Sequence, residues 1–353
     1  MHKTLYLGLD AHTRTCVLTA IDQSGERVSA TEFSTSESGL IHEVTRLQGQ
    51  FKYLALEESS LAGWVAGVLR PHVTHLIVCN PFHNALISQS NRKDDFTDSY
   101  KLARLLRLDE LTSVYHTDED HRIDFKIAVQ QYLSFVEHHK RLKLQLKAKY
   151  HQAGIFNVSG TRVLSKRNRD LYLNELSTKG RRRIMENLYD HLDSLEQRRK
   201  TARTTMIELG QKYPEIQQFQ RIPGIGVVGA HVFSGFIQSP DRFATKQKLW
   251  RYCKLGIRER SSAGKPLAFN RLDQSGVGIL KAVSYQCWLS SQRTKEPNEV
   301  CLFYEASLRR TGDKLHARLN TQRKVLAVLW TIWRKDVTYN PKLFLSPNSA
   351  MIA

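Results

Sequence analysis

Four acidic residues of this chain have the type and spacing of a divalent-metal site. Asp10 and Glu57 each end a segment that reads as a β-strand, and Asp95 and Asp98 lie three residues apart on one face of a predicted helix. Carboxylate oxygens are the ligands that Mg²⁺ and Mn²⁺ prefer. A pair of such ions can activate the attacking oxygen and stabilise the leaving oxygen of a phosphodiester. The four residues therefore predict phosphoryl transfer with Mg²⁺ or Mn²⁺.

Each of these acids also has a simpler interpretation. An aspartate after a strand is more often a turn or capping residue, and Asp95 is also a favourable charge for a helix N-terminus. Only the joint placement favours a metal site. Two acidic neighbours, Asp94 and Glu58, compete for the same roles. Glu58 is set aside because, if Leu56 faces the core, strand alternation puts Glu57 and Glu58 on opposite sides.

The elements that must position these acids form an α/β pattern. Strand-like segments are found at residues 3–9, 15–21, 27–33, 53–56 and 75–79, and helix-like segments at about 38–47, 61–69 and 95–106. Three antiparallel strands followed by alternating helices and strands is the order of a ribonuclease-H-like mixed sheet. In that order the first and fourth strands are neighbours, which brings Asp10 close to Glu57.

The rest of the chain reads as mainly helical. We divide the sequence into a catalytic domain at 1–155, a helical coiled-coil connector at 156–213 and a mainly α C-terminal domain at 214–353. Helices are predicted at about 123–150, 181–209 and 318–334, and the tail from 341 is expected to be loose. Apolar residues recur through the second of these helices at Ile184, Leu188, Leu192, Leu195, Ala202, Met206 and Leu209. They fit either a coiled-coil seam between chains or a helix packed on its own domain.

Charge is the unusual bulk property. The chain has 53 Lys and Arg against 34 Asp and Glu, a net charge of +19 that we interpret as spread over most of the chain. Such a field favours nucleic acid as a partner over a membrane surface. The sequence has no long apolar run and no leader pattern at its start. The cysteines lack metal or disulfide spacing, so we expect reduced core thiols in a cytoplasmic protein.

A second group of residues suggests phosphate contacts. Residues 221–229 read RIPGIGVVG, in which Gly224 and Gly226 belong to a turn like that of helix-hairpin-helix elements, whose amides bind DNA phosphates. An ordinary tight turn between helices fits equally well.

Two adjacent serines follow in a small-residue loop. Ser261 and Ser262 lie in KLGIRERSSAG at 254–264, and basic residues flank them at Arg258, Arg260, Lys265 and Arg271. A serine beside phosphate-binding cations is a candidate nucleophile. Such a composition is also common in loops that have no catalytic role.

Through both its acidic residues and its glycine and serine residues, the chain resembles the DEDD transposases of bacterial insertion sequences of the IS110 type. This family includes the Piv DNA invertases. The resemblance rests on YLGLD at 6–10, LALE at 54–57, KDDFTDSYKLA at 93–103, IPGIG at 222–226, DRF at 241–243 and LGIRERSSAGK at 255–265. It assigns the family's four acids to Asp10, Glu57, Asp95 and Asp98, and its nucleophilic serine to Ser262. Ser99 and Ala263 replace a usual alanine and glycine; both changes exchange small residues, so we expect an active enzyme.

The resemblance implies more than these residues establish. It implies a RuvC-like catalytic domain, similar to Holliday-junction resolvases, and a covalent phosphoserine link to DNA. It also implies homo-oligomers, dimers or tetramers, in which the acids of one protomer meet the serine domain of another. A structured non-coding RNA would bridge target and donor DNA. The expected location is the bacterial cytoplasm, in association with the nucleoid.

The leading hypothesis is therefore a DNA transposase or site-specific recombinase of an insertion sequence. The alternatives are a metal-dependent junction endonuclease that hydrolyses DNA without covalent attachment, and a non-catalytic nucleic-acid-binding derivative. The four intact acids argue against the last.

Overall fold

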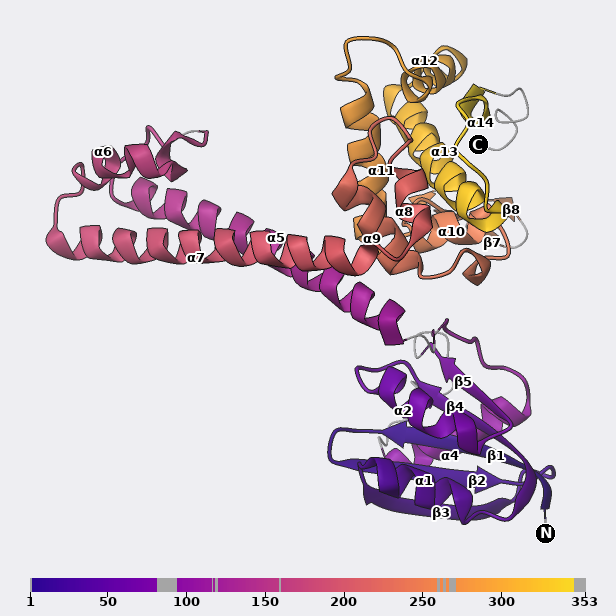
Figure 1. Cartoon of the computed structure of the whole chain (residues 1–353). Helices are drawn as coiled ribbons and strands as arrows, with labels where there is room; N and C mark the ends of the chain where they lie inside the picture. Colours follow the sequence, from indigo (N-terminus) through magenta and orange to yellow (C-terminus); the bar gives the residue numbers. More distant parts are fainter. Residues whose placement is uncertain are drawn as a thin grey trace. The chain divides into compact units, whose positions relative to one another are not determined.

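The computed structural model of the chain describes residues 2–80, 94–115, 117, 120–158, 160–258, 261–262, 265–266 and 271–345. The chain forms two compact units, Met1–Asp118 and Glu119–Ala353 (Figure 1). The first unit is built on a sheet and the second is almost entirely helical. The sequence-based division at residue 155 differs from this one, because the helix that starts near residue 120 packs within the second unit.

The first unit contains a five-stranded mixed sheet in the order β3-β2-β1-β4-β5. Its strands are β1 (His2–Ala11), β2 (Thr15–Ile21), β3 (Arg27–Ser34), β4 (Gly49–Glu57) and β5 (His75–Cys79). β1, β2 and β3 are antiparallel neighbours, whereas β4 runs parallel to both β1 and β5. The predicted strands are confirmed, and this arrangement is consistent with a ribonuclease-H-like fold.

Helices cover both faces of this sheet. The helices are α1 (Glu37–Thr45), α2 (Ala62–Leu69), which a short 3-10 turn (Arg70–His72) follows, and α4 (Asp95–Arg107). α1 and α2 share an apolar core with Leu5, Leu7 and Leu9 of β1. α4 packs on β1, β2 and β4 and makes its close contact at Gly8 of β1. Successive residues of a strand face opposite sides of the sheet, so α4 covers the face opposite to the one that carries Leu7 and Leu9. The described residues contain all three helices that the sequence predicts here.

The second unit begins with a long helical hairpin. α5 (Asp120–Gln152) and α7 (Lys179–Gly210) run side by side in opposite directions (Figure 1). Between them lie two 3-10 turns (Arg162–Leu164 and Lys166–Asn168) and the short helix α6 (Arg169–Leu173). We call this hairpin the arm. Its apolar core joins Leu142, Leu146 and Tyr150 of α5 to Tyr189 and Leu192 of α7.

The apolar row of the second long helix therefore packs mainly against the same chain. Leu195 is only 8% exposed and belongs to the core between α5 and α7, and Leu188 packs against that core. Leu209 packs against the core of the C-terminal helices. Ile184 departs from the pattern, because it is 54% exposed. Of the two interpretations of this row, the helix packed on its own unit is the one that the structure supports.

The remaining helices form a compact domain at the base of the arm. They are α8 (Pro214–Phe219), α9 (Val227–Ile237), α10 (Lys246–Tyr252), α11 (Gly278–Ser291), α12 (Glu299–Thr311), α13 (Lys314–Lys335) and α14 (Lys342–Leu345), with a 3-10 turn at Pro240–Arg242. One core joins them to the adjacent ends of α5 and α7. The prediction of a loose tail is wrong as far as Leu345, since Phe344 of α14 is buried in this core.

Other expectations concern buried residues. All five cysteines are free and buried, as expected for core thiols. Trp330 is buried and donates a hydrogen bond from Nε1 to the Pro240 carbonyl, so it is a core residue. Within the described part of the chain, no helix has the length and apolar character needed to cross a membrane.

Candidate metal centre

Strand register brings Asp10 and Glu57 to the same end of the sheet. β1 and β4 pair in parallel as far as Leu9 opposite Leu56, and Asp10 and Glu57 are the next residue on each strand. Paired residues on parallel neighbours point to the same side of the sheet. Glu57 is half-buried, whereas Glu58 is exposed. The first and fourth strands thus lie side by side, as expected.

A close helix–strand contact brings α4 to this end of the sheet. A β-carbon on Gly8 would lie 1.9 Å from the Ser99 carbonyl oxygen and 2.5 Å from the Ala103 amide nitrogen, so only glycine permits this approach. The Ser99 and Thr19 hydroxyl groups are hydrogen-bonded at 2.7 Å, and both residues are completely buried. Ser99 therefore has a specific partner on β2.

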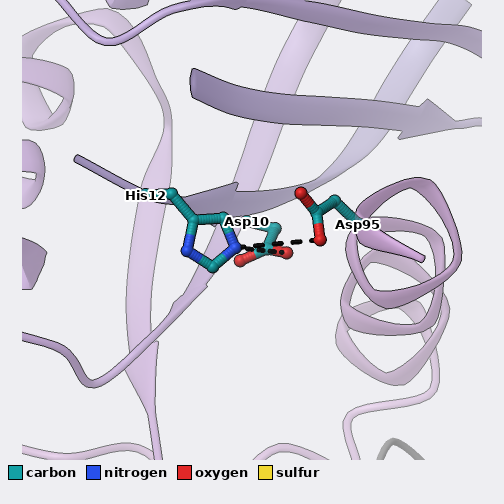
Figure 2. Close-up of side chains that lie close together, drawn as sticks. All are labelled: Asp10, His12 and Asp95. Atoms are coloured by element: carbon teal, nitrogen blue, oxygen red, sulfur yellow. Dashed lines mark ion pairs between the residues drawn. The ribbon is translucent and has the colours of Figure 1, made fainter. Parts of the chain in front are cut away.

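The first turn of α4 carries Asp95 and Asp98. Asp95 points toward Asp10 and His12 (Figure 2), and His12 Nε2 lies 3.4 Å from Asp10 Oδ2 and 3.8 Å from Asp95 Oδ1. One ligand atom from each of these three residues lies within 4.8 Å of the other two. Glu57 and Asp98 are outside this tight group in the described structure. The Oδ1 atom of Asp98 lies 3.5 Å from Lys101 Nζ.

His12 is the residue that sequence reasoning missed. It lies two positions after Asp10, at the end of β1, where the chain turns toward β2. Its side chain is 56% exposed, and a neutral imidazole nitrogen is a common metal ligand. The only sequence signal is the pattern Asp-x-His after an apolar strand, which carries little weight without the position of Asp95.

The pKa of Asp10 is raised above the usual value of an aspartate. Burial is the largest cause, because Asp10 is only 21% exposed, and the nearby charges of Asp95 and Asp98 raise the pKa further, whereas His12 lowers it. A carboxylate that is costly to ionise among other carboxylates is stabilised by a cation. Oxygen donors, one imidazole nitrogen and crowded negative charge together fit a divalent metal ion.

The two serines lie in the second unit, on a narrow β-ribbon. β6 (Ile257–Arg258) pairs with β9 (Arg271–Leu272), and inside this pair β7 (Ser261–Ser262) pairs with β8 (Lys265–Pro266). The backbone register sets Ser262 opposite Lys265 and Arg258 opposite Arg271. Arg258 and Arg271 are exposed. The side chains of both serines, of Arg260 and of Lys265 lie outside the described residues, as does Ala263.

The glycine turn predicted at residues 221–229 connects α8 to α9. Gly224 has a φ of +88°, and a β-carbon there would lie 2.2 Å from the Cys287 carbonyl oxygen, so this position requires glycine. Gly226 is the N-cap of α9. A hollow of about 410 Å³ lies over the turn and is lined by both glycines together with Arg203, Gln286 and Ser290. The turn can therefore offer backbone amides beside a cation.

Comparison with known protein families gives two matches. A family model for DEDD transposases of the IS110 type matches residues 7–157, and a model described as the transposase IS116/IS110/IS902 family matches residues 216–304. The first match contains the acids and His12, and the second contains the glycine turn and the serine ribbon. No curated protein matches the chain significantly.

Proposed function

This chain belongs to the IS110 family of DEDD transposases, and from that premise we propose that it recombines DNA with a metal-bound acidic site and a serine nucleophile. The family makes it a DNA-cutting and rejoining enzyme with DNA as its partner. The grouping of Asp10, Asp95 and His12 at one end of the sheet is the observation that carries the proposal.

The metal site is proposed to comprise Asp10, Glu57, Asp95 and Asp98, with His12 as an additional nitrogen ligand. The family implies a divalent metal, and carboxylate ligands favour Mg²⁺ or Mn²⁺. When bound, the ion supplies positive charge to the phosphate oxygens on which negative charge develops. The protein contributes fixed ligand positions, because Gly8 lets α4 lie directly on β1.

Ser262 is proposed to cut the strand. Its hydroxyl group loses its proton as the oxygen forms a bond to phosphorus, the bond from phosphorus to one deoxyribose oxygen breaks, and that oxygen takes up a proton and leaves as a hydroxyl group. The phosphoserine ester conserves the bond energy, so a hydroxyl group from another strand can reverse the step and join the new ends. The position of Lys265 opposite Ser262 in the ribbon supports this role, because a cation there would offset the phosphate charge.

Other residues of the second unit are proposed to hold the DNA backbone. Arg258 and Arg271 are exposed and paired across the ribbon, which suits two contacts to neighbouring phosphates. Gly224 and Gly226 border a hollow beside Arg203, where amides can donate to a phosphate oxygen. By likeness to the family, we also propose that a structured RNA guides the protein and that it assembles into dimers or tetramers. We further propose that it is located in the cytoplasm, at the nucleoid.

One experiment separates this proposal from its alternatives. Purified protein is incubated with element-end DNA, the flanking non-coding RNA and Mg²⁺, then denatured and analysed for protein-linked DNA. We expect a covalent adduct that is lost in Ser262→Ala and kept in the matched control Ser261→Ala. Cleavage that survives Ser262→Ala without an adduct would identify a hydrolytic nuclease instead. Binding without any cleavage would leave only the non-catalytic alternative.

The acids are tested in the same assay. Asp10→Asn should lower cleavage about 10³-fold or more while nucleic-acid binding stays nearly intact. Glu57→Gln should also abolish cleavage, whereas the neighbouring exposed Glu58→Gln should not. For His12→Ala we expect weaker Mn²⁺ binding by isothermal titration calorimetry. Full activity of Asp10→Asn would rule out the metal site.

A further inference from the structure

The far half of the arm carries a hollow that the proposed chemistry does not use. It has a volume of about 460 Å³ and lies between α5, the residues just before the 3-10 turn at Arg162–Leu164, and α7. Its lining residues are Val136, His139, Lys140, Lys143, Leu144, Lys147, Gly160, Thr161, Leu164 and Arg199. None of these described lining residues is acidic. This volume falls within the range of small-ligand sites.

The cations around this hollow form a row on one face of α5. Lys140, Lys143 and Lys147 are three and four residues apart, so they lie one above the other over about 10 Å of helix. Lys140 and Lys143 have no hydrogen-bond or ion-pair partner among the described residues. Lys147 Nζ donates to the Gly160 carbonyl at 2.6 Å and fixes the opposite wall. The row presents two uncompensated charges to a ligand.

The floor of the hollow is apolar. Leu144 lies between the lysines and is 59% exposed, and Val136 and Leu164 also line the hollow. An apolar side chain among cations suits the flat face of a base whose phosphates contact the lysines. A duplex keeps its base faces stacked, so this surface fits unpaired nucleotides.

An exposed aromatic ring lies close to this row. Phe156 is 75% exposed and stacks on His151 with ring centroids 6.0 Å apart. His151 is four residues after Lys147 and seven after Leu144, so it continues the same face of α5 one turn farther along. Aromatic faces beside a basic row are the usual elements of single-strand recognition.

We infer that this face of the arm, from Lys140 to Phe156, binds an unpaired segment of nucleic acid. Lys140 and Lys143 contact successive phosphates, one base occupies the hollow over Leu144, and a following base stacks on Phe156. The inference extends the proposed function, because it names where a strand outside the acidic and serine sites is held. RNA and single-stranded DNA share this chemistry, and their affinities distinguish them.

The test measures binding by the full chain, in EDTA so that no cleavage intervenes. The probes are three labelled 20-nucleotide ligands of one sequence: RNA, single-stranded DNA and duplex DNA. Fluorescence anisotropy is recorded for the double variant Lys140→Glu/Lys143→Glu and for the charge-matched control Lys149→Glu/Arg198→Glu, whose residues are exposed on the arm but do not line the hollow. Phe156→Ala is a third variant, and its exposed side chain makes it safe for folding.

We expect the lysine pair to weaken single-strand binding about 10-fold or more and to reduce the salt slope by about 1.4, the value for two phosphates. Phe156→Ala should weaken the same binding about 5-fold or more, with little effect on duplex binding. The tighter of the RNA and DNA ligands identifies the strand that the arm holds.

The inference would be overturned if the double lysine variant and its control lost the same amount of binding affinity. It would also be overturned if the lysine variant lost as much affinity for duplex DNA as for single strands, or if Phe156→Ala lost no affinity for single strands. Because no cleavage is measured, these outcomes are independent of whether Asp10 and Ser262 act as proposed.

Discussion

The two units differ in net charge. Met1–Asp118 contains 11 Lys and Arg against 14 Asp and Glu, a net charge of −3, whereas Glu119–Ala353 contains 42 against 20, a net charge of +22. The positive charge therefore lies in the second unit, which makes up 235 of the 353 residues and so most of the chain, whereas the first unit is slightly acidic. The net charge of the first unit does not favour polyanions, so we expect the second unit to supply most of the affinity for DNA.

The two units also differ in how their proposed functional residues are held. In the first unit, strand register and one glycine contact fix Asp10 and Asp95 on rigid elements. In the second, the serines lie on a two-stranded ribbon with short strands, and cations are presented along helices. We therefore expect the proposed DNA cleavage at the acids to depend on how closely α4 packs on the sheet. We expect nucleic-acid binding by the second unit to depend mainly on the number of its positive charges.

The salt dependence of DNA binding is the largest effect that this comparison predicts. Raising NaCl from 50 to 200 mM should weaken binding about 10³-fold or more, as expected for six to ten phosphate contacts. Arg258→Gln/Arg271→Gln should reduce the slope of log affinity against log salt by about 1.8. Lys3→Gln/Arg104→Gln, exposed cations of the first unit, should leave it unchanged. Fluorescence anisotropy at several salt concentrations measures this slope. The same change of slope in both double variants would mean that the two units do not differ in their contribution to DNA binding.

Overpacking at Gly8 should be the next largest effect. Gly8→Val forces side-chain atoms into the backbone of α4 and should lower the free energy of unfolding of the first unit by about 3 kcal/mol. Gly67→Ala in α2 has no atom within 4 Å of the new methyl group and should be neutral or slightly stabilising. Urea titration followed by circular dichroism measures both variants. A stable Gly8→Val protein with normal cleavage would contradict the packing argument.

Lys324 offers a test within the basic unit. Burial and, to a smaller extent, the nearby charge of Lys246 lower the pKa of Lys324 to about 8. Between pH 8 and the usual lysine pKa the unfolded chain binds more protons, so stability should rise with pH across this interval. Lys324→Met should therefore stabilise the unit by about 2 kcal/mol at pH 7. This gain in stability should vanish above pH 10.5, where the lysine is neutral in both states. Thermal melts at pH 7 and pH 10.5 measure it, and the same gain at both pH values would contradict this explanation.

The smallest expected effect concerns the Thr19–Ser99 hydrogen bond. Ser99→Ala or Thr19→Val alone leaves one buried hydroxyl group without this partner, which should cost about 1 to 2 kcal/mol. The double variant should cost less than the sum, with a coupling energy of about 1 kcal/mol. Additive losses would mean that this hydrogen bond does not help to hold α4 on the sheet.

Much of the first unit follows from the sequence, because its strands are apolar segments bounded by polar turns, and Asp10 and Glu57 lie near the ends of two of them. The predicted strand at 15–21 and the helix start at Asp95 match the structure. The role of His12 could not be predicted, because its approach to Asp95 depends on a turn and on a helix 83 positions farther along the chain.

The second unit was harder to predict, for physical reasons. A row such as Leu188, Leu192 and Leu195 specifies an apolar helix face but not its partner, which here is α5 of the same chain. The burial of Phe344 depends on contacts with Phe303 and Tyr339, which local sequence does not reveal. Ser262 was recognised by family resemblance, because adjacent serines have no periodicity of their own.

The direct contact between Gly8 and α4 also has a consequence for synthesis of the protein. Thr19 and Ser99 are 80 residues apart, so the acidic site cannot form until the ribosome has released the chain beyond α4. A metal ion that binds only the folded unit then adds its binding energy to folding. Cells short of that metal should contain less of this protein, because unfolded chains are degraded, in addition to having slower recombination.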